Sequence, residues 1–140
     1  MDDLKFALRL SEGIVVVDLT GRIMIGETSS ALMMVLHTLV EEGKRRVLLN
    51  LAEVTALDST GLGTLVAGFA SFEKAGGRLK LLNLSPKIAE LLTVTKLYIV
   101  FDVFDDEAEA VTSFYTLKEQ LKQPLETHAV KIVGSDSSVL

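Results

Sequence analysis

The chain has 140 residues, 49% of them apolar and 24% charged, which fits a single globular domain and excludes a disordered, collagen-like or coiled-coil protein. Its formal net charge is −5, so nucleic acid and anionic membranes are not expected as partners, because phosphate groups are bound by basic surfaces. The chain contains no cysteine, which excludes disulfides, thiol catalysis and thiolate metal sites.

The start of the chain bears on where the protein works. Asp2, Asp3, Lys5 and Arg9 interrupt the first residues, so there is no unbroken apolar stretch of the kind that a signal peptide requires. No run approaches the roughly 18 apolar residues of a membrane span. We therefore expect a cytoplasmic protein without a membrane span.

The first predicted elements form a hairpin. Residues 4–10 alternate apolar and polar side chains, the pattern of a strand with one buried face, and this strand should lie at a sheet edge. After a turn at 11–13, the β-branched run at 14–19 predicts a more central strand paired with the first. Gly21 is expected to end this second strand.

A helix and a buried strand follow. Apolar residues repeat at helical spacing over 28–42, and Gly43 is the stop signal. The N-cap candidates are Thr28, Ser29 and Ser30. The basic residues 44–46 are explained by favourable placement against the helix dipole. The apolar run within 46–51 predicts an interior strand, which needs no alternation because both of its faces are covered.

The next helix begins at residues 58–60 and ends at 76–77, and its inward stripe consists of Leu62, Leu65, Val66, Phe69 and Phe72. Residues 78–84 repeat the strand pattern. Ser85 followed by Pro86 predicts the start of a further helix, because proline suits the first helical position, and this helix should run to about Leu92.

The last predicted elements are a strand that includes 103–104 and a helix that begins at the acidic residues 105–107 and reaches about Leu121. Its inward residues are Ala108, Val111, Phe114, Tyr115 and the aliphatic stem of Lys118. Beyond Pro124, residues 129–133 could add an edge strand. The order of elements predicts an α/β fold, a mixed β-sheet of four to five strands with about four α-helices.

Residues 57–63, Leu-Asp-Ser-Thr-Gly-Leu-Gly, carry the candidate chemistry. They join an interior strand to a helix, the kind of junction where α/β sheets bind ligands. A hydroxyl at a helix N-terminus lies beside unpaired amides that accommodate a phosphate. Asp, Ser and Thr are also the preferred N-cap residues, which explains them without any function. Gly61 and Gly63, however, each cost up to about 1 kcal/mol of helix stability and need a compensating reason.

The face of this helix opposite the apolar stripe has only small side chains: Gly63, Thr64, Ala67, Gly68, Ala70 and Ser71. Two interpretations remain open on spacing alone. A partner protein could approach the helix closely along this face, or the face could pack closely against another element of the same domain.

Residues 57–63 resemble the Asp-Ser-Ser/Thr-Gly signature of STAS-domain anti-sigma factor antagonists. In that family the first hydroxyl after the Asp accepts a phosphate, and the matching residue here is Ser59. The resemblance covers about residues 4–121, including the initial hairpin, the Gly21 turn and the closing segment 101–111. It implies a STAS-like domain over 1–122, followed by a C-terminal tail at 123–140.

The resemblance implies a switch operated by other proteins. An anti-sigma factor with serine kinase activity would bind the unmodified protein and phosphorylate Ser59, and a serine phosphatase would reverse the reaction. A phosphate adds about −1.5 to −2 charge, so beside Asp58 it would oppose binding and release the partner, regulating transcription indirectly. Thr60 is the rival acceptor. The expected partner-binding residues are Asp58, Ser59, Thr60, Gly61, Gly63, Thr64, Ala67 and Gly68.

The chain departs from the family pattern at two positions. Met24 stands where an acidic residue is common, three positions after Gly21, and the nearest downstream carboxylate is Glu27. This change bears on the contact that the acid would make with a kinase. Lys96 stands where a helix-ending glycine is common.

Other classes of function find little support. A serine nucleophile needs an oriented base, and the imidazoles are only His37, within a predicted helix, and His128, in the tail. We therefore expect no catalytic residue, no metal site and no cofactor. An alternative keeps the STAS resemblance without the kinase, as a constitutive adaptor or a small-ligand or lipid-transport-associated binding module.

Overall fold

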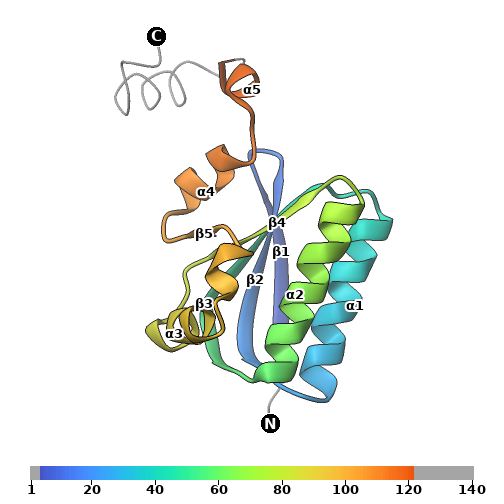
Figure 1. The fold of residues 1–140 in the computed structure, drawn as a ribbon. Helices are drawn as coiled ribbons and strands as arrows, with labels where there is room; N and C mark the ends of the chain where they lie inside the picture. The colour runs from blue at the N-terminus through green and yellow to red at the C-terminus, as the bar shows by residue number, and fades with distance from the viewer. Residues whose placement is uncertain (1–3, 122–140) are drawn as a thin grey trace.

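The computed structural model describes residues 4–121 and contains a five-stranded sheet in the order β1-β2-β3-β4-β5, with helices on both faces (Figure 1). The strands are β1 (Leu4–Ser11), β2 (Ile14–Ile23), β3 (Arg46–Leu57), β4 (Arg78–Leu82) and β5 (Val103–Phe104). The helices are α1 (Glu27–Glu41), α2 (Ser59–Lys74), α3 (Pro86–Val94), α4 (Glu107–Ser113) and α5 (Leu117–Leu121), with a 3₁₀ turn, η1, at Leu97–Ile99. The predicted mixed α/β fold is confirmed.

The predicted hairpin of β1 and β2 is present. The antiparallel register ends at Ser11↔Ile14, and Glu12 and Gly13 turn the chain with φ angles of 49° and 85°, the conformation that tight hairpin turns require. The other neighbouring strands are parallel, so the chain crosses back through a helix between each pair. β1 lies at the edge of the sheet and β2 inside it, as predicted.

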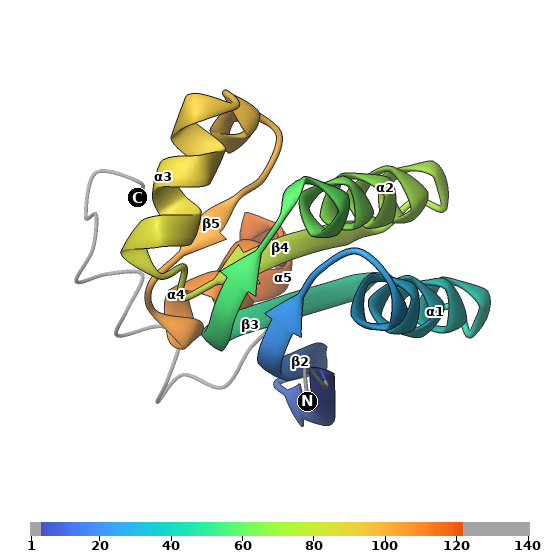
Figure 2. The same cartoon turned by 90° about the horizontal axis from the view of Figure 1, so that it is seen from below.

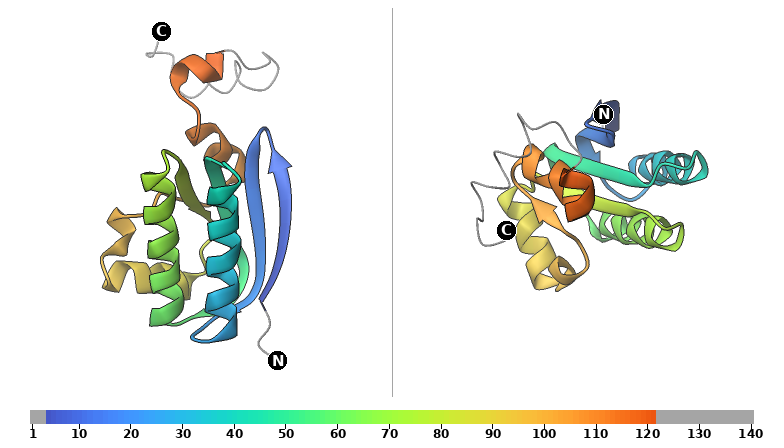
Figure 3. Two further views of the ribbon diagram at one scale, coloured as in Figure 1. Left: turned by 90° about the vertical axis from the view of Figure 1, so that its right-hand side faces the viewer. Right: turned by 90° about the horizontal axis from the view of Figure 1, so that it is seen from above.

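Two hydrophobic clusters pack against opposite faces of the sheet. From β2, Val15 and Val17 join the cluster that includes the inward leucines of α1 and α2, whereas Ile14 and Val16 join the cluster that includes α4. Figure 3 shows α1 and α2 side by side on one face. Because the middle strands are covered on both sides, they contain unbroken apolar runs, at 14–17 in β2 and 47–49 in β3.

The prediction that β2 ends at Gly21 is wrong, because the strand continues to Ile23. The pairing of β2 with β3 shifts register twice near Gly21, and this glycine has a φ of 126°, so the strand bends without stopping. β3 is longer than the predicted 46–51 and reaches Leu57. The two strands pair as far as Ile23↔Leu57, immediately before α2.

The predicted N-cap of the first helix is wrong. α1 begins one residue earlier, after Gly26, and has no side-chain cap. The Thr28 hydroxyl instead donates to the carbonyl of Met24 at 3.0 Å and accepts from its amide at 2.9 Å. Thr28 therefore stabilises the loop before the helix rather than the free amides of the helix.

The single helix predicted for 105–121 is two helices, because α4 ends at Ser113 and α5 begins at Leu117. Thr116 and Glu119 form a capping box, in which each side chain accepts from the other residue's amide, at 3.1 and 2.8 Å. Phe114 is buried as predicted, but Ala108 and Lys118 are exposed.

The beginning of α3 agrees with the prediction. The Ser85 hydroxyl accepts from the amide of Ile88 at 3.2 Å, and Pro86 is the first helical residue. β4 ends at Leu82, before the predicted end at 84, because Asn83 leaves the extended conformation with a φ of 63°.

None of the helices within 4–121 is long and apolar enough to cross a membrane. The edge strand proposed for 129–133 lies outside the described residues.

Candidate functional site

Ser59 is the first residue of α2 and follows directly after the carboxyl end of β3. Figure 2 looks onto this end of the molecule, where β2 and β3 finish beside the first turns of α1 and α2. Ser59 and Thr60 are exposed, and within residues 4–121 the Ser59 hydroxyl makes no hydrogen bond. The hydroxyl is therefore available for modification.

Asp58 fixes the geometry around Ser59. One carboxylate oxygen, Oδ1, caps α2 by accepting from the Gly61 amide at 2.8 Å, and Oδ2 accepts from the Ile25 amide at 2.8 Å. These two hydrogen bonds hold the pKa of Asp58 below its ordinary value, and the bond from the Gly61 amide has the larger effect. One ionised side chain thus joins the β2–α1 loop to the N-terminus of α2.

Gly61 is required by close packing inside the domain. A Cβ atom at this position would lie 2.2 Å from the carbonyl oxygen of Ile23, at the end of β2, far closer than any real contact. The missing side chain lets the first turn of α2 approach the end of β2. This accounts for Gly61 without any partner, and the residue is buried.

The two interpretations of the small-residue face of α2 apply to different residues. Thr64 and Gly68 are buried, and a Cβ on Gly68 would lie 2.5 Å from the Leu36 side chain of α1. Gly68 therefore serves packing between α1 and α2, whereas the Thr64 hydroxyl donates to the carbonyl of Thr60 at 3.1 Å. Gly63 is exposed, with open space where a side chain would project, and Ala67 is partly exposed.

The expected partner-binding residues are thus divided by the fold. Those accessible at or near the N-terminus of α2 are Asp58, Ser59, Thr60, Gly63 and, in part, Ala67. The buried residues Gly61, Thr64 and Gly68 shape the helix packing beneath them. The structure brings the accessible set together within the first two and a half turns or so of α2, and residues three and four apart share a helix face.

An apolar groove next to this turn was not foreseen from the sequence. It has a volume of about 510 Å³ and runs between α3 and the ends of β2 and β3, with Met24, Leu57, Leu91 and Val94 among its lining residues. Ile25, whose amide is bonded to Asp58, is 73% exposed. The apolar character of Met24 and Ile25 was visible in the sequence, but the position of Met24 beside α3 depends on the fold.

The candidate catalytic bases do not reach Ser59. His37 is exposed on α1, 3.1 Å from Glu41, and ten residues of helix separate it from Glu27, about 15 Å along the axis. His128 lies outside the described residues. Within 4–121 there is also no group of three or more His, Cys, Asp or Glu side chains that could hold a metal ion.

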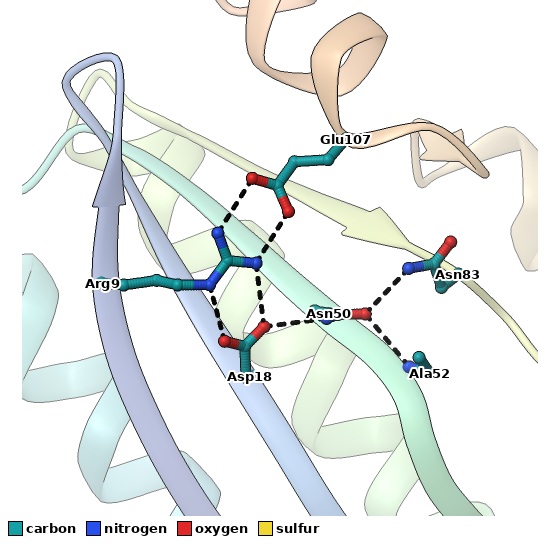
Figure 4. Close-up of polar contacts among 6 residues, drawn as sticks. All are labelled: Arg9, Asp18, Asn50, Ala52, Asn83 and Glu107. Carbon is teal, nitrogen blue, oxygen red and sulfur yellow. Dashed lines mark hydrogen bonds and ion pairs between the residues drawn. The ribbon is translucent and has the colours of Figure 1, made fainter.

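A second polar cluster lies on the sheet face that α4 covers (Figure 4). Arg9 donates to both oxygens of Asp18, at 2.7 and 3.2 Å, and to both oxygens of Glu107, at 2.9 and 2.7 Å. Asn50 donates to Asp18 at 2.8 Å and accepts from Asn83 at 3.1 Å. The cluster joins four neighbouring chain segments of the sheet to the start of α4.

The hydrogen bonds from Arg9 lower the pKa of both Asp18 and Glu107 below their ordinary values. The same two carboxylates raise the pKa of Arg9, and Glu107 has the larger effect. Each of these five residues has a partner within the cluster. We interpret it as the attachment of α4, not as a second site.

The fold and this site define a small α/β domain with an exposed serine at a helix N-terminus. The STAS domain family model matches residues 5–110, and the chain belongs to the STAS domain family. An anti-sigma F factor antagonist from Paenibacillus polymyxa is 22% identical over 111 residues, which cover 79% of this chain and 94% of that protein.

Solved structures share the fold. An anti-sigma factor antagonist from Mycobacterium paratuberculosis matches with a TM-score of 0.72 and 23% identity, over 81% of this chain and 95% of that one. The Bacillus cell fate determinant SpoIIAA in its phosphorylated form matches with a TM-score of 0.62 and 22% identity, over 79% of this chain and 100% of that one.

Proposed function

We propose that this protein is an anti-sigma factor antagonist whose binding is switched by phosphorylation of Ser59. In its unmodified form it binds an anti-sigma factor with serine kinase activity, which phosphorylates Ser59, and a serine phosphatase restores the binding form. The observation that carries the proposal is the exposed, unbonded hydroxyl of Ser59 at the N-terminus of α2, beside a fixed carboxylate.

The charge at this turn explains how the switch works. Asp58 is ionised, since two backbone amides hold its pKa low. A phosphate on Ser59 adds a further charge of about −1.5 to −2 next to it. A partner surface that accommodates one carboxylate must then desolvate two anionic groups, unless it brings new cations. A loss of about 1.4 kcal/mol in binding free energy for this reason weakens affinity tenfold.

The groove beside the site supports an apolar contribution to partner binding. Met24 lies where the resemblance leads us to expect an acid, and its side chain lines the groove with Leu91 and Val94. The exposed Ile25 extends this apolar surface toward Asp58. We propose that the partner covers these side chains while the N-terminus of α2 provides the polar, switchable contact.

Two variants of Ser59 test the switch. Ser59→Asp is expected to weaken binding of the anti-sigma factor at least about tenfold, whereas Ser59→Ala keeps binding and gains no phosphate on incubation with the kinase and ATP, as measured by intact mass. Titration calorimetry or surface plasmon resonance gives the affinities. Equal affinities of the two variants, or phosphate on Ser59→Ala, for instance at Thr60, would contradict the proposal.

Ser71 provides a matched control. It is exposed on the same helix, and twelve residues separate it from Ser59, about 18 Å along the axis. Ser71→Asp introduces the same charge far from the site and should leave affinity unchanged. If Ser71→Asp weakens binding as much as Ser59→Asp does, the effect is one of general charge rather than of this site.

The alternative is a STAS domain that is not phosphorylated, either a constitutive adaptor or a small-ligand or lipid-transport-associated binding module. Met24 favours it, because the acid expected to meet a kinase is missing. Intact mass of the wild-type protein after incubation with kinase and ATP separates the two, since an adaptor gains no phosphate. We also propose that the protein is not an enzyme, and a screen for turnover of esters and phosphoesters checks this.

A further inference from the structure

A second apolar groove lies between β1 and α1, and we call it the β1–α1 groove. It has a volume of about 450 Å³, and its lining includes Phe6 and Leu8 of β1 and Met34, Val35 and Leu39 of α1. Leu8 is 52% exposed and Met34 is 69% exposed. The described residues leave this apolar surface open to solvent.

The groove runs beside an open sheet edge. β1 is the outermost strand of the sheet and is eight residues long, and every second residue of an edge strand directs its backbone N–H and C=O away from the sheet. Leu10, near the end of the strand, is 72% exposed. A long apolar edge of this kind attracts another strand, and proteins usually cover it.

The path of the described chain brings α5 to the end of the sheet where β1 turns into β2. The Tyr115 hydroxyl donates to the carbonyl of Glu12 in the β1–β2 turn, and Arg46, at the start of β3, donates to Glu119 of α5 at 2.8 Å. Figures 1 and 3 show α5 at the end of the molecule where β1 finishes. The described chain therefore finishes at the same end of the sheet as the β1–β2 turn.

We propose that residues 129–133, Ala-Val-Lys-Ile-Val, pair with the free edge of β1 and place Val130 and Ile132 over the β1–α1 groove. Residues 122–128 can span about 25 Å when extended, whereas β3, to which α5 is bonded, lies only two strands, about 10 Å, from β1. A segment that enters at the end of β1 and runs back along it is antiparallel to β1. Val130 and Ile132, two residues apart, then face the same side.

This inference is independent of the proposed function. The β1–α1 groove is lined by the middle of β1 and by α1, whereas Ser59 lies at the start of α2, after the end of β3. No residue that lines the groove belongs to β3 or α2. Loss of the switch would leave the docking of 129–133 intact, and loss of the docking would leave the switch intact.

Because the chain contains no cysteine, introduced cysteines report the docking cleanly. Leu8→Cys is combined in turn with a cysteine at each position from 129 to 133 in the full chain, and mild oxidation is followed by non-reducing electrophoresis and intact mass. We expect a disulfide within one chain at positions 130 and 132 and much less at 129, 131 and 133. The control replaces Leu8→Cys by Ala70→Cys, exposed on α2, which should give none of these disulfides.

Three results would overturn the proposal: no disulfide at any position, equal yields without alternation, or disulfides only between two chains, which would mean that a second copy covers the groove. A second measurement uses the chain without cysteines. Val130→Asp should raise the amide exchange rate of alternate β1 residues at least about tenfold, whereas Lys131→Asp, on the opposite side of the segment, should not. Equal exchange in the two variants would also contradict the docking.

Discussion

The two glycines at the start of α2 lie in different surroundings, so their occurrence has different physical explanations. At Gly61 the carbonyl oxygen of Ile23 occupies the space that a side chain would need, 2.2 Å from an added Cβ. At Gly63 nothing lies within 4 Å of an added Cβ, so the domain itself gives no packing reason for glycine. Gly61 therefore belongs to the fold, whereas an open position on an exposed helix face is where a partner can come close.

Alanine substitutions separate these causes. Gly61→Ala should lower the free energy of unfolding by about 2 kcal/mol or more, because either the end of β2 or the first turn of α2 must shift. Gly63→Ala should raise it by up to about 1 kcal/mol, since alanine is the better helix former. Urea unfolding followed by circular dichroism measures both. A destabilised Gly63→Ala, or an unaffected Gly61→Ala, would contradict these assignments.

At the scale of the elements, local signals in the sequence predicted several features that have a local cause. The Glu12–Gly13 turn, the Ser85 cap and the start of α2 after Asp58 all follow from nearest-neighbour chemistry. The division between α4 and α5 was also local, because Thr116 and Glu119 have capping-box spacing. The continuous helical pattern of 105–121 concealed it.

Other features depended on contacts between distant segments. The Thr28 hydroxyl forms hydrogen bonds with Met24 in the loop before α1, so the general preference for threonine at N-caps gave a wrong prediction here. β2 passes Gly21 because its pairing with β3 continues. At the candidate site, Asp58 and Ser59 could be predicted from a few adjacent residues, but not the burial of Gly68 against Leu36 or the groove that Met24 forms with α3.

The attachment of α4 to the sheet depends on Arg9. Arg9→Met should raise the pKa of Asp18 and of Glu107 toward their ordinary values, because each loses the hydrogen bonds that stabilise its ionised form. The side chain of Arg9 is 40% exposed, so solvent screening limits the loss of stability to about 1 kcal/mol. Carboxyl chemical shifts measured by NMR against pH give both pKa values.

Lys5 is the control for this prediction. It is an exposed cation on the same strand, four residues before Arg9, and residues at even spacing on a strand share a face. Lys5→Met removes the same charge without removing a bond to Asp18 or Glu107. If both substitutions moved the two pKa values equally, general electrostatics rather than the hydrogen bonds from Arg9 would be responsible.

At the scale of the whole molecule, the sheet separates the surface at Ser59 from the end where α5 lies. The hydroxyl of Ser59 lies where β2 and β3 end, and α5 lies beyond the β1–β2 turn at the other end (Figure 1). The strands between them are packed on both faces. A charge added at Ser59 thus changes a surface without disturbing the core, which is what a docking switch needs.

The same arrangement predicts how stability depends on pH. Asp18, Asp58, Glu107 and Glu119 all have a pKa below the ordinary value, each because hydrogen bonds favour its ionised form. In the unfolded chain these groups bind protons near pH 3.9 for Asp and 4.3 for Glu, as rough reference values. Below about pH 5 the unfolded state therefore holds more protons than the folded state, and the free energy of unfolding falls as the pH falls.

This contribution should be complete above about pH 5 and disappear as the pH falls through the lowered folded-state values. Urea unfolding at constant ionic strength between pH 7 and 2 measures it. Because Asp18 and Glu107 depend on Arg9, Arg9→Met should flatten the acid side of the curve, whereas Lys5→Met should shift it much less. A free energy of unfolding that stays constant from pH 5 to 3 would show that these four carboxylates are not stabilised in the folded protein as their hydrogen bonds require.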